Sequence, residues 1–558
     1  MNALVLILIV LAWLIGGYFL YSKFLENKLI KPNDKNKTPA QIFKDKLDYK
    51  PAKKAFLFGH HFASIAGAGP IIGPILAVSY FGWLFVVLWI ALGSVIIGAV
   101  HDYLSLMLSV RHKGEGIAKL SEKTIGKKTF YIFSILLWLT LMLIITVFAV
   151  SSAQSLVEVP QLVIPFFGIT FTAICLGFAV YKFKKNKLIS SLIALALVIG
   201  FIWLGIKFPI SLPFTTIISQ NIWLIILFIY ALVVSLIPVW ILLQPRDYVS
   251  SIFLFSFLVI GLLAIIIARP IINAPATIPF SISKIPLWPI LFITVACGAV
   301  SGFHALVSSG TTSKQLAKES HGRFIGYGAM LAEALVAVLV LIFVTAGLKW
   351  SQGIPPIEDL NFFQNALSTG WVVAFGKGFA NVVNSAFKFV PISILIVLGS
   401  LIVNIFILTS LDTSTRIGRM IADEAIPKKK TSKFFKKFLL TLAILIPAFI
   451  LAITNSYKTI WNMFGSSNQL IAGIVLIAIS AYLVEHKKPI WYTLIPSFFM
   501  VITTLGALFY GLFNKNGYIF GNLNIGLIII SGLLIIFGIF VFVETMIKII
   551  NIKKKQLF

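Results

Sequence analysis

The chain has 558 residues, of which 59% are hydrophobic and 11% are charged, and its mean hydropathy is +1.00. This composition excludes a soluble globular protein and predicts one that crosses the membrane many times. The formal net charge of +28 does not indicate a nucleic-acid partner, because the Lys and Arg residues punctuate the hydrophobic segments. Cys175 and Cys297 are the two cysteines, and their apolar surroundings predict neither a disulfide framework nor a Cys-based metal site.

Fifteen segments are long and apolar enough to cross about 30 Å of hydrocarbon. They lie near residues 1–22, 55–80, 83–108, 129–157, 161–181, 187–208, 219–243, 250–269, 287–310, 325–348, 388–412, 434–454, 467–485, 489–513 and 523–548. The first segment lacks a basic n-region and an A-x-A cleavage signal, and it predicts a retained anchor helix. Residues 349–387 begin with polar residues and are interrupted by Gly376 and Gly378, which predicts an external loop with short interfacial helices.

The loops on the two sides of these segments differ sharply in charge. One side carries 38 of the 46 Lys and Arg residues, including those of residues 23–54, 109–128 and 413–437. Because cytoplasmic loops retain basic residues, we expect the N-terminus outside and the C-terminus in the cytoplasm.

A short pattern occurs twice inside the apolar segments. Gly59-x-His61 is followed after five residues by Gly67, and Gly302-x-His304 is followed after five residues by Gly310. Histidine and clustered glycine are costly in a lipid-facing helix, so the two copies predict a pair of interior sites. Matching interruptions in two halves of a membrane protein are typical of a transporter's binding site.

The predicted orientation makes this repeat inverted, because the two Gly-x-His helices run in opposite directions. Each is followed by a helix with one carboxylate, Asp102 in the first half and Glu333 in the second. We therefore predict an all-α protein with a five-plus-five inverted repeat and a broken first helix in each half, the sodium-symporter (LeuT-like) architecture. The predicted parts are an anchor helix with a basic loop (1–54), a first repeat (55–269) with an inserted hairpin (161–208), a second repeat (287–485) and a C-terminal helix pair (486–558).

Both breaks have a physical cause. Residues 67–70 (GAGP), together with Gly73 and Pro74, supply flexible and donor-lacking residues in the first copy, and Gly298, Ser301 and Gly302 do so in the second without proline. Unwinding frees backbone N–H and C=O groups, which is tolerable only where protein or a water-filled cavity satisfies them. A half-helix N-terminus then suits a substrate carboxylate.

Residues 58–70 (FGHHFASIAGAGP) resemble the signature of the carbon starvation protein A family of bacterial and archaeal transporters. Further matching stretches, in the same order, are residues 243–248 (LQPRDY), 291–315 (LFITVACGAVSGFHALVSSGTTSKQ), 411–416 (LDTSTR) and 464–469 (FGSSNQ). The resemblance implies a proton-coupled uptake system of the inner membrane for carbon starvation, with peptides as one assigned substrate and pyruvate as another. It also implies a fold like that of the amino acid/polyamine/organocation superfamily. The family commonly has glutamine where this chain has His101.

The candidate functional residues follow from the repeat, from the buried carboxylates and from the resemblance. Those expected to bind substrate are His60, His61, Ser64, Gly67, Ala68, Gly69, Ser301, Gly302, His304 and Ser308, and those expected to couple a proton or ion are Asp102, Glu333, Asp412, Thr413 and Ser414. A charge inside an apolar segment costs about 2.5–3.5 kcal/mol on insertion scales, so the membrane carboxylates indicate function. No cofactor or metal is predicted.

Each candidate has a structural alternative. The pair His60 and His61 lies near the cytoplasmic end of its segment and is compatible with an interfacial structural role, and the glycines are compatible with close helix packing. The membrane carboxylates are compatible with static pairing. Asp412 in particular is compatible with a helix anchor paired with Arg416 or Arg419.

Two further motifs have plain structural interpretations. Residues 244–247 (QPRD) predict a turn at a helix end with a local Arg–Asp pair. Asn468 and Gln469 follow a small-residue run and predict the N-cap of a helix first and a substrate contact second.

These features favour a secondary-active importer that works by alternating access, with H⁺ or Na⁺ as the coupling ion and an anionic or zwitterionic nutrient as substrate. The resemblance implies that the substrate is a small peptide, with pyruvate as the alternative. Protonation of His61, His304, Asp102 or Glu333 is expected to accompany substrate entry. An intramembrane metal enzyme with histidine ligands, including His60 and His101, is less favoured, because no HExxH-type spacing occurs. A channel would need pore-lining rings from an oligomer, which a single pseudo-symmetric chain does not need.

Overall fold

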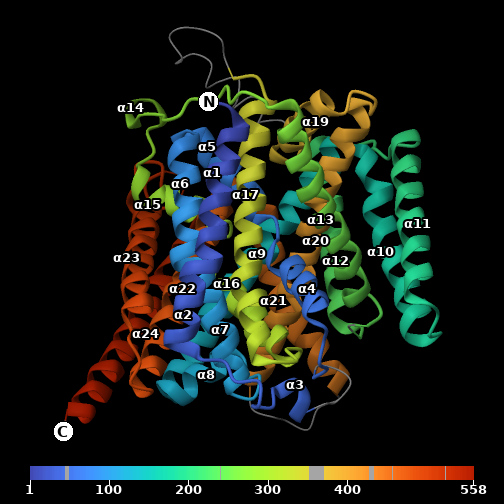
Figure 1. Ribbon diagram of the computed structural model, residues 1–558. Coiled ribbons are helices and arrows are strands. Elements are labelled where there is room, and N and C mark those ends of the chain that lie inside the picture. The colour runs from blue at the N-terminus through green and yellow to red at the C-terminus, as the bar shows by residue number, and fades with distance from the viewer. Residues whose placement is uncertain are drawn as a thin grey trace.

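The computed structural model describes residues 1–43, 49–238, 240–350, 370–426, 433–454, 457–521 and 523–557. Within these ranges the protein is a bundle of helices, most of which run from one end of the molecule to the other (Figure 1). The described residues form no β-strand, only two isolated bridges, Asn2 with Ile271 and Ala52 with Leu316. The predicted all-α class is confirmed.

The helices follow the hydrophobic segments of the sequence. In chain order they are α1 Ala3–Gly16, α2 Ser22–Leu25, α3 Pro39–Ile42, α4 Lys54–Ile65, α5 Gly69–Phe81, α6 Trp83–Gly93, α7 Ala99–Arg111, α8 Ile117–Thr124, α9 Lys127–Glu158, α10 Val163–Gly177, α11 Lys187–Lys207, α12 Thr216–Leu236, α13 Leu243–Ala268, α14 Phe280–Ser283, α15 Leu287–Thr294, α16 Gly302–Gly310, α17 Gly328–Gly347, α19 Trp371–Ala386, α20 Ile392–Ala425, α21 Lys433–Thr454, α22 Tyr457–Glu485, α23 Trp491–Phe513 and α24 Ile525–Leu557. Short π-helical turns join α1 to α2 and α6 to α7 and lead into α17.

Among the described residues, thirteen continuous helical stretches are long and apolar enough to cross a membrane, and the bent pair of α4 and α5 makes fourteen. The remaining one of the fifteen predicted segments, residues 287–310, is divided into α15 and α16 by seven residues without helix. It is therefore not one continuous span. The protein is therefore a multi-pass membrane protein, and its internal repeat stays a prediction.

The stretch expected as an external loop is only partly described. Residues 351–369 lie outside the described ranges, and α19 follows them. Gly376 and Gly378 were expected to interrupt this stretch, but α19 runs through both. Both glycines lie where the neighbouring helices α17 and α20 come too close for a side chain, so they serve packing instead.

The central helices can be recognised by their burial. In α22 all of the most apolar 18-residue window is buried, and in the stretch containing α17 the buried share is 83%. The corresponding share in α11, at the edge of the bundle in Figure 1, is 28%. A helix that is apolar on every side and fully buried lies in the protein core, so α17 and α22 mark the centre around which a site can form.

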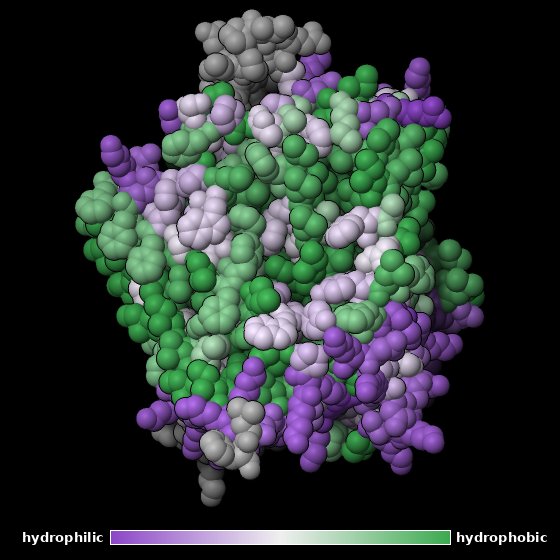
Figure 2. Space-filling model, turned by 60° about the vertical axis from the view of Figure 1, so that its left-hand side comes forward, coloured by the Kyte–Doolittle hydropathy of each residue, from purple (hydrophilic) through white to green (hydrophobic). Residues whose placement is uncertain are grey.

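The two ends of the molecule differ in polarity. The N- and C-termini lie at opposite ends, as predicted (Figure 1). Figure 2 shows a wide hydrophobic band across the face in view, with hydrophilic residues gathered mainly at the end where the C-terminus lies. We call this the basic end, because the lysine-rich loops around α3 and α8 meet there.

Candidate functional site

The first predicted break lies between α4 and α5. α4 ends at Ile65 and α5 begins at Gly69, and the two helices are bent by 45°. Pro70 stands in the first turn of α5, where no intrahelical hydrogen bond needs its missing N–H, and it disfavours helix in the residue before it. The predicted unwinding at this point is confirmed, although Pro74 lies inside α5 without ending it.

The second break, between α15 and α16, is held by a side chain of the central helix α22. The Phe303 N–H at the start of α16 donates to Asn468 Oδ1 at 2.9 Å, and Asn468 Nδ2 donates to Ser301 Oγ at 3.1 Å. Asn468 therefore supplies hydrogen bonds that the interrupted helix cannot make by itself. It also occupies one of the free N–H groups at the start of α16, which had been expected to face a substrate carboxylate.

The prediction that Asn468 and Gln469 cap a helix is wrong. α22 begins at Tyr457, so both residues lie well inside it. The Gln469 side chain donates to the Phe292 carbonyl at 2.6 Å, and it therefore secures α15 as Asn468 secures α16. Two neighbouring polar residues in an apolar segment did indicate a special role for Asn468 and Gln469. The small residues before them suggested a helix start, which was the wrong role.

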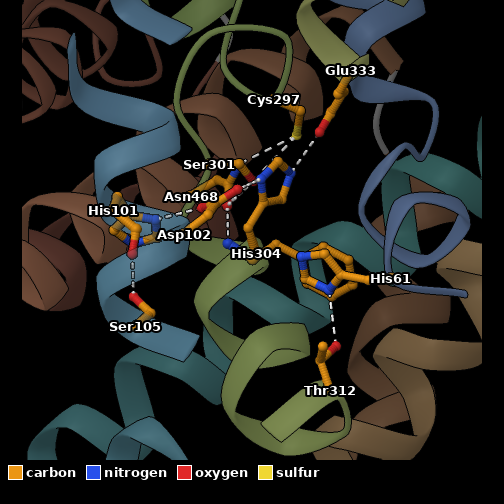
Figure 3. A network of polar contacts seen from close by, with 11 residues as sticks. His61, His101, Asp102, Ser105, Cys297, Ser301, His304, Thr312, Glu333 and Asn468 are labelled. Carbon is orange, nitrogen blue, oxygen red and sulfur yellow. Dashed lines mark hydrogen bonds and ion pairs between the residues drawn. The ribbon is translucent and has the colours of Figure 1, made fainter. Parts of the chain in front are cut away.

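At the centre, His304 of α16 lies between two carboxylates, as Figure 3 shows. Its Nδ1 is 2.8 Å from Asp102 Oδ2 on α7, and its Nε2 is 3.1 Å from Glu333 Oε2 on α17. All three side chains are fully buried. The Nδ1 contact with Asp102 is a hydrogen bond, and the Nε2 contact with Glu333 is an ion-pair contact without hydrogen-bond geometry, so three helices meet in one ionisable group. We call these three residues the central cluster.

Two more histidines surround the central cluster (Figure 3). His101 Nδ1 is 2.8 Å from Asp102 Oδ1, so the carboxylate of Asp102 lies between two imidazoles. His61 belongs to the other broken helix, and its Nδ1 is 2.8 Å from Thr312 Oγ1. The structure therefore brings the residues of the two Gly-x-His motifs into one buried region, but it does not place His61 in contact with a carboxylate.

A second buried group involves Asp412 of α20. Its carboxylate is paired with Arg246 of α13 and accepts a hydrogen bond from the Tyr230 hydroxyl at 2.9 Å. Both charged side chains are fully buried. Asp247 lies beside this pair, 3.5 Å from Arg246 Nη2 and 3.5 Å from His60 Nδ1.

The expected pairing of Asp412 with Arg416 or Arg419 is thus wrong. Both arginines reach α12 instead, where Arg416 donates to the Val234 and Ile237 carbonyls and Arg419 to the Ser235 carbonyl. Basic side chains at the carbonyl end of a helix satisfy its free acceptors and its dipole. The QPRD motif was expected in a turn with a local Arg–Asp pair. It forms the first turn of α13 instead, where Arg246 does lie 3.5 Å from Asp247 and also reaches across to Asp412.

A cavity of about 380 Å³ opens at the basic end. His60, Ser64 and Thr413 are the predicted residues that line it, together with Asp247 and Ser309. We call it the entrance cavity. Its walls include α16, which also carries His304, so one helix of nine residues joins the cavity to the central cluster.

The other predicted residues lie deeper. Outside the lining of the entrance cavity are His61, Gly67, Ala68, Gly69, Ser301, Gly302, His304, Ser308, Asp102, Glu333 and Ser414, all of them buried. The predicted site is therefore split between an accessible group near the basic end and an inaccessible group at the centre. Sequence reasoning missed Tyr230 completely, since nothing in an apolar helix marks a single tyrosine as a partner of Asp412.

The histidines do not converge on one point as metal ligands. Across the described part of the chain, no group of three or more His, Cys, Asp or Glu side chains is arranged to hold a metal ion. His60 pairs with Asp247, His61 with Thr312, and His101 and His304 share Asp102. His61, His101 and His304 are hydrogen-bonded through Nδ1, and His60 lies at ion-pair distance from Asp247.

Broken membrane helices around a buried ionisable group define the class of secondary transporters. Residues 2–351 and 359–507 match the family model described as "Carbon starvation protein CstA", and the chain belongs to this family.

Its relatives include the pyruvate/proton symporter BtsT of Escherichia coli, 30% identical over 90% of this chain and 80% of that protein. The peptide transporter CstA of Campylobacter jejuni is 31% identical, over 88% of this chain and 77% of that protein. The peptide transporter CstA of Bacillus subtilis is 31% identical, over 90% of this chain and 89% of that protein.

A similar arrangement of helices occurs in a solved structure, that of the manganese transporter of Eremococcus coleocola. The TM-score is 0.52, with 14% sequence identity, and the match covers 89% of this chain and 95% of that one. At this identity the likeness shows the fold alone.

Proposed function

We propose that the protein is a secondary-active importer that couples the uptake of small peptides to protons by alternating access. The observation that carries the proposal is the central cluster, in which His304 is held between Asp102 and Glu333 at 2.8 and 3.1 Å in a fully buried site. Ionisable groups inside a membrane protein are costly and mark ion or proton pathways. The names of the relatives, a proton symporter among them, support the same reading.

The central cluster can hold one exchangeable proton. An imidazolium and two carboxylates carry a net charge of −1, and one further proton makes the group neutral. Among the described residues, the ion pairs of Asp102 and Glu333 are formed with histidines alone, so no fixed cation neutralises the excess charge. A buried net charge is expensive, and a proton arriving with the substrate removes it.

The pair of Arg246 and Asp412 favours H⁺ over Na⁺ as the coupling ion. Asp412, Thr413 and Ser414 were candidates for oxygen ligands of a sodium ion. The guanidinium of Arg246 pairs with the Asp412 carboxylate, so a fixed cation already holds the place that sodium would take. The proton then has the central cluster as its site.

The entrance cavity supports a zwitterionic substrate. Its lining contains the basic residues Lys314, Arg416, Arg419 and Lys437 and the acidic residues Asp247, Asp423 and Glu424. A peptide has a carboxylate and an ammonium group, and a lining of both signs suits both ends. The second candidate is pyruvate, which the Escherichia coli relative is named for, and which needs basic residues alone.

The topology belongs to the same proposal. We place the basic end in the cytoplasm, the protein in the inner membrane, and the N-terminus outside, because cytoplasmic loops retain lysine and arginine. We also propose the five-plus-five repeat of residues 55–269 and 287–485, and the two broken helices are the observation that supports it. The entrance cavity then faces the cytoplasm and is the exit for the imported substrate.

Uptake into proteoliposomes under an inward proton gradient tests the function. Labelled di- or tripeptide and labelled pyruvate are compared, each with and without sodium. Concentrative uptake of peptide without sodium supports the proposal, and concentrative uptake of pyruvate alone makes the protein a monocarboxylate symporter. Sodium-dependent uptake, or no gradient-driven uptake of either compound, contradicts proton-coupled transport of these substrates.

A further inference from the structure

A second cavity at the basic end has a different character from the entrance cavity. It has a volume of about 1250 Å³ and shares Gln244, Gln315, Arg416, Arg419 and Lys437 with the entrance cavity. Of the residues that the structure describes, seven basic ones line it and no acidic one does, and the five lysines among them are Lys50, Lys53, Lys182, Lys187 and Lys437. We call it the basic cavity.

No carboxylate among the described residues forms an ion pair with these lysines. Elsewhere at this end lysines pair with acidic residues, as Lys123 does with Glu115 at 2.6 Å. Within the described part of the chain, none of the five lysines of the basic cavity forms an ion pair, and the Lys187 ammonium instead lies 4.3 Å from the ring centre of Phe56. The general excess of lysine in cytoplasmic loops does not account for this, because that rule places lysines at one end without gathering them around one hollow.

The walls between the lysines are apolar. Phe178, Leu236, Ile237, Pro238 and Trp240 all line the basic cavity, at the ends of α10 and α12. Trp240 and Phe178 are in edge contact, with ring centres 5.7 Å apart. Both helices belong to membrane-crossing stretches that end here, so the cavity lies at the depth of the headgroups, where aromatic rings and basic side chains gather.

We propose that the basic cavity binds a phosphate-bearing anion, and that its occupant is the headgroup of an anionic phospholipid. Unpaired lysines supply the charge that a phosphate group needs, and the apolar walls suit the acyl chains that lead away from it. A free phosphate ion would also be attracted by the lysines, but it would make no favourable contact with the apolar walls. The entrance cavity next to it carries Asp247, Asp423 and Glu424 and is unsuited to such a ligand.

The site also has a structural consequence for transport. Arg416 and Arg419 line the basic cavity and at the same time hold the carbonyl end of α12. Both arginines lie on α20, one or two turns beyond Asp412, and both line the entrance cavity as well. A bound anion would therefore be held by the same helix ends that shape the cytoplasmic exit.

Native mass spectrometry of the detergent-purified full chain tests this inference, with phosphatidylglycerol titrated against phosphatidylcholine. The variant combines K182Q, K187Q and K437Q, and the control combines K35Q, K128Q and K554Q, three exposed lysines at the same end that do not line the cavity. A lysine near a lipid surface contributes about fivefold in affinity, so the variant should bind its tightest phosphatidylglycerol about 100-fold more weakly at low salt. The control should bind it as the parent does.

A charge-preserving variant with K182R, K187R and K437R separates lost charge from lost folding, because it should retain the lipid. Titration with inorganic phosphate separates the two sources of the anion. Phosphate that displaces the lipid at millimolar concentration would show that the same group is recognised in both. Equal phosphatidylglycerol binding in the glutamine variant and its control, or equal binding of phosphatidylcholine, would overturn the proposal.

Discussion

Replacing Glu333 by glutamine should separate substrate movement from proton movement. The substitution keeps the shape of the side chain and removes one of the two carboxylates beside His304, leaving the ion pair of His304 with Asp102 at 2.8 Å. The remaining pair is neutral as a whole, so the variant imitates the proton-loaded cluster permanently. We expect it to fold, because no buried charge is left without a partner.

The size of the effect follows from the charge count. A gradient of two pH units supplies about 2.7 kcal/mol for one coupled proton, which corresponds to about 100-fold accumulation of substrate. Without a titratable group at position 333, Glu333→Gln should equilibrate substrate to a ratio of about 1. Exchange of labelled for unlabelled substrate needs no net proton movement, and it should continue.

The assay is gradient-driven uptake and counterflow in the same proteoliposomes. Glu158→Gln is the matched control, because Glu158 is a partly buried membrane carboxylate whose side chain accepts a hydrogen bond from Gln154, outside the central cluster. The control should accumulate substrate normally. Unchanged uphill uptake in Glu333→Gln would refute the role of this carboxylate in coupling, and loss of both uptake and exchange would point to a defect in binding or folding.

Further predictions concern stability and pH. Arg246→Met should destabilise the protein by about 3–5 kcal/mol in a thermal-unfolding assay, because it leaves the buried Asp412 carboxylate without its cation. Asp412→Leu should cost less, because Arg246 keeps Asp247 at 3.5 Å, and adding Asp412→Leu to Arg246→Met should recover part of the loss. Gly302→Ala should lower the free energy of unfolding by about 1–3 kcal/mol in the same assay, because the added methyl group would overlap the backbone of α22. Asp34 accepts hydrogen bonds from the backbone and hydroxyl of Ser320, which holds its pKa below its usual range. That contribution to stability is present above the ordinary Asp pKa of about 3.9 and is lost as pH falls through the lowered pKa of Asp34, so the protection factor of the Ser320 amide should be smaller at pH 3 than at pH 5. Equal exchange after correction for the intrinsic rate would contradict the last prediction.

Local chemistry made the fold largely predictable. The run from Gly67 to Pro70 predicted a break because proline and glycine act on the chain within a few residues, and the bend lies there. The helix through Gly376 and Gly378 was mispredicted, since a glycine that breaks a helix and one that lets a neighbour approach look the same in a sequence. Surrounding helices decide between the two.

The candidate site was predictable in its residues but less so in its partners. His304, Asp102 and Glu333 were singled out because charge is costly in an apolar segment, and the structure brings all three together. Arg246 and Asp412 are 166 positions apart, and no local pattern joins them, so arginines one or two turns from Asp412 were the obvious partners. Long-range pairing depends on how helices pack, which the spacing of residues along one helix does not contain.

The position of α16 explains how a buried proton site and an open cavity can be coupled in one transporter. His304 lies in the first turn of α16 and Ser309 in its last, so the central cluster and the entrance cavity are attached to opposite ends of one short helix. At the first end, Asn468 holds the Phe303 N–H at 2.9 Å, while at the other the Ser309 carbonyl accepts a hydrogen bond from Ser313 at 3.0 Å. If this nine-residue helix moves as a rigid unit, a shift of its His304 end on a change of charge also moves Ser309 in the wall of the cavity. Bending of the backbone beside the helix would reduce that movement. The seven residues without helix before α16 adjoin its His304 end, so a bend of the chain at this break would lie beside the proton site and not beside the cavity.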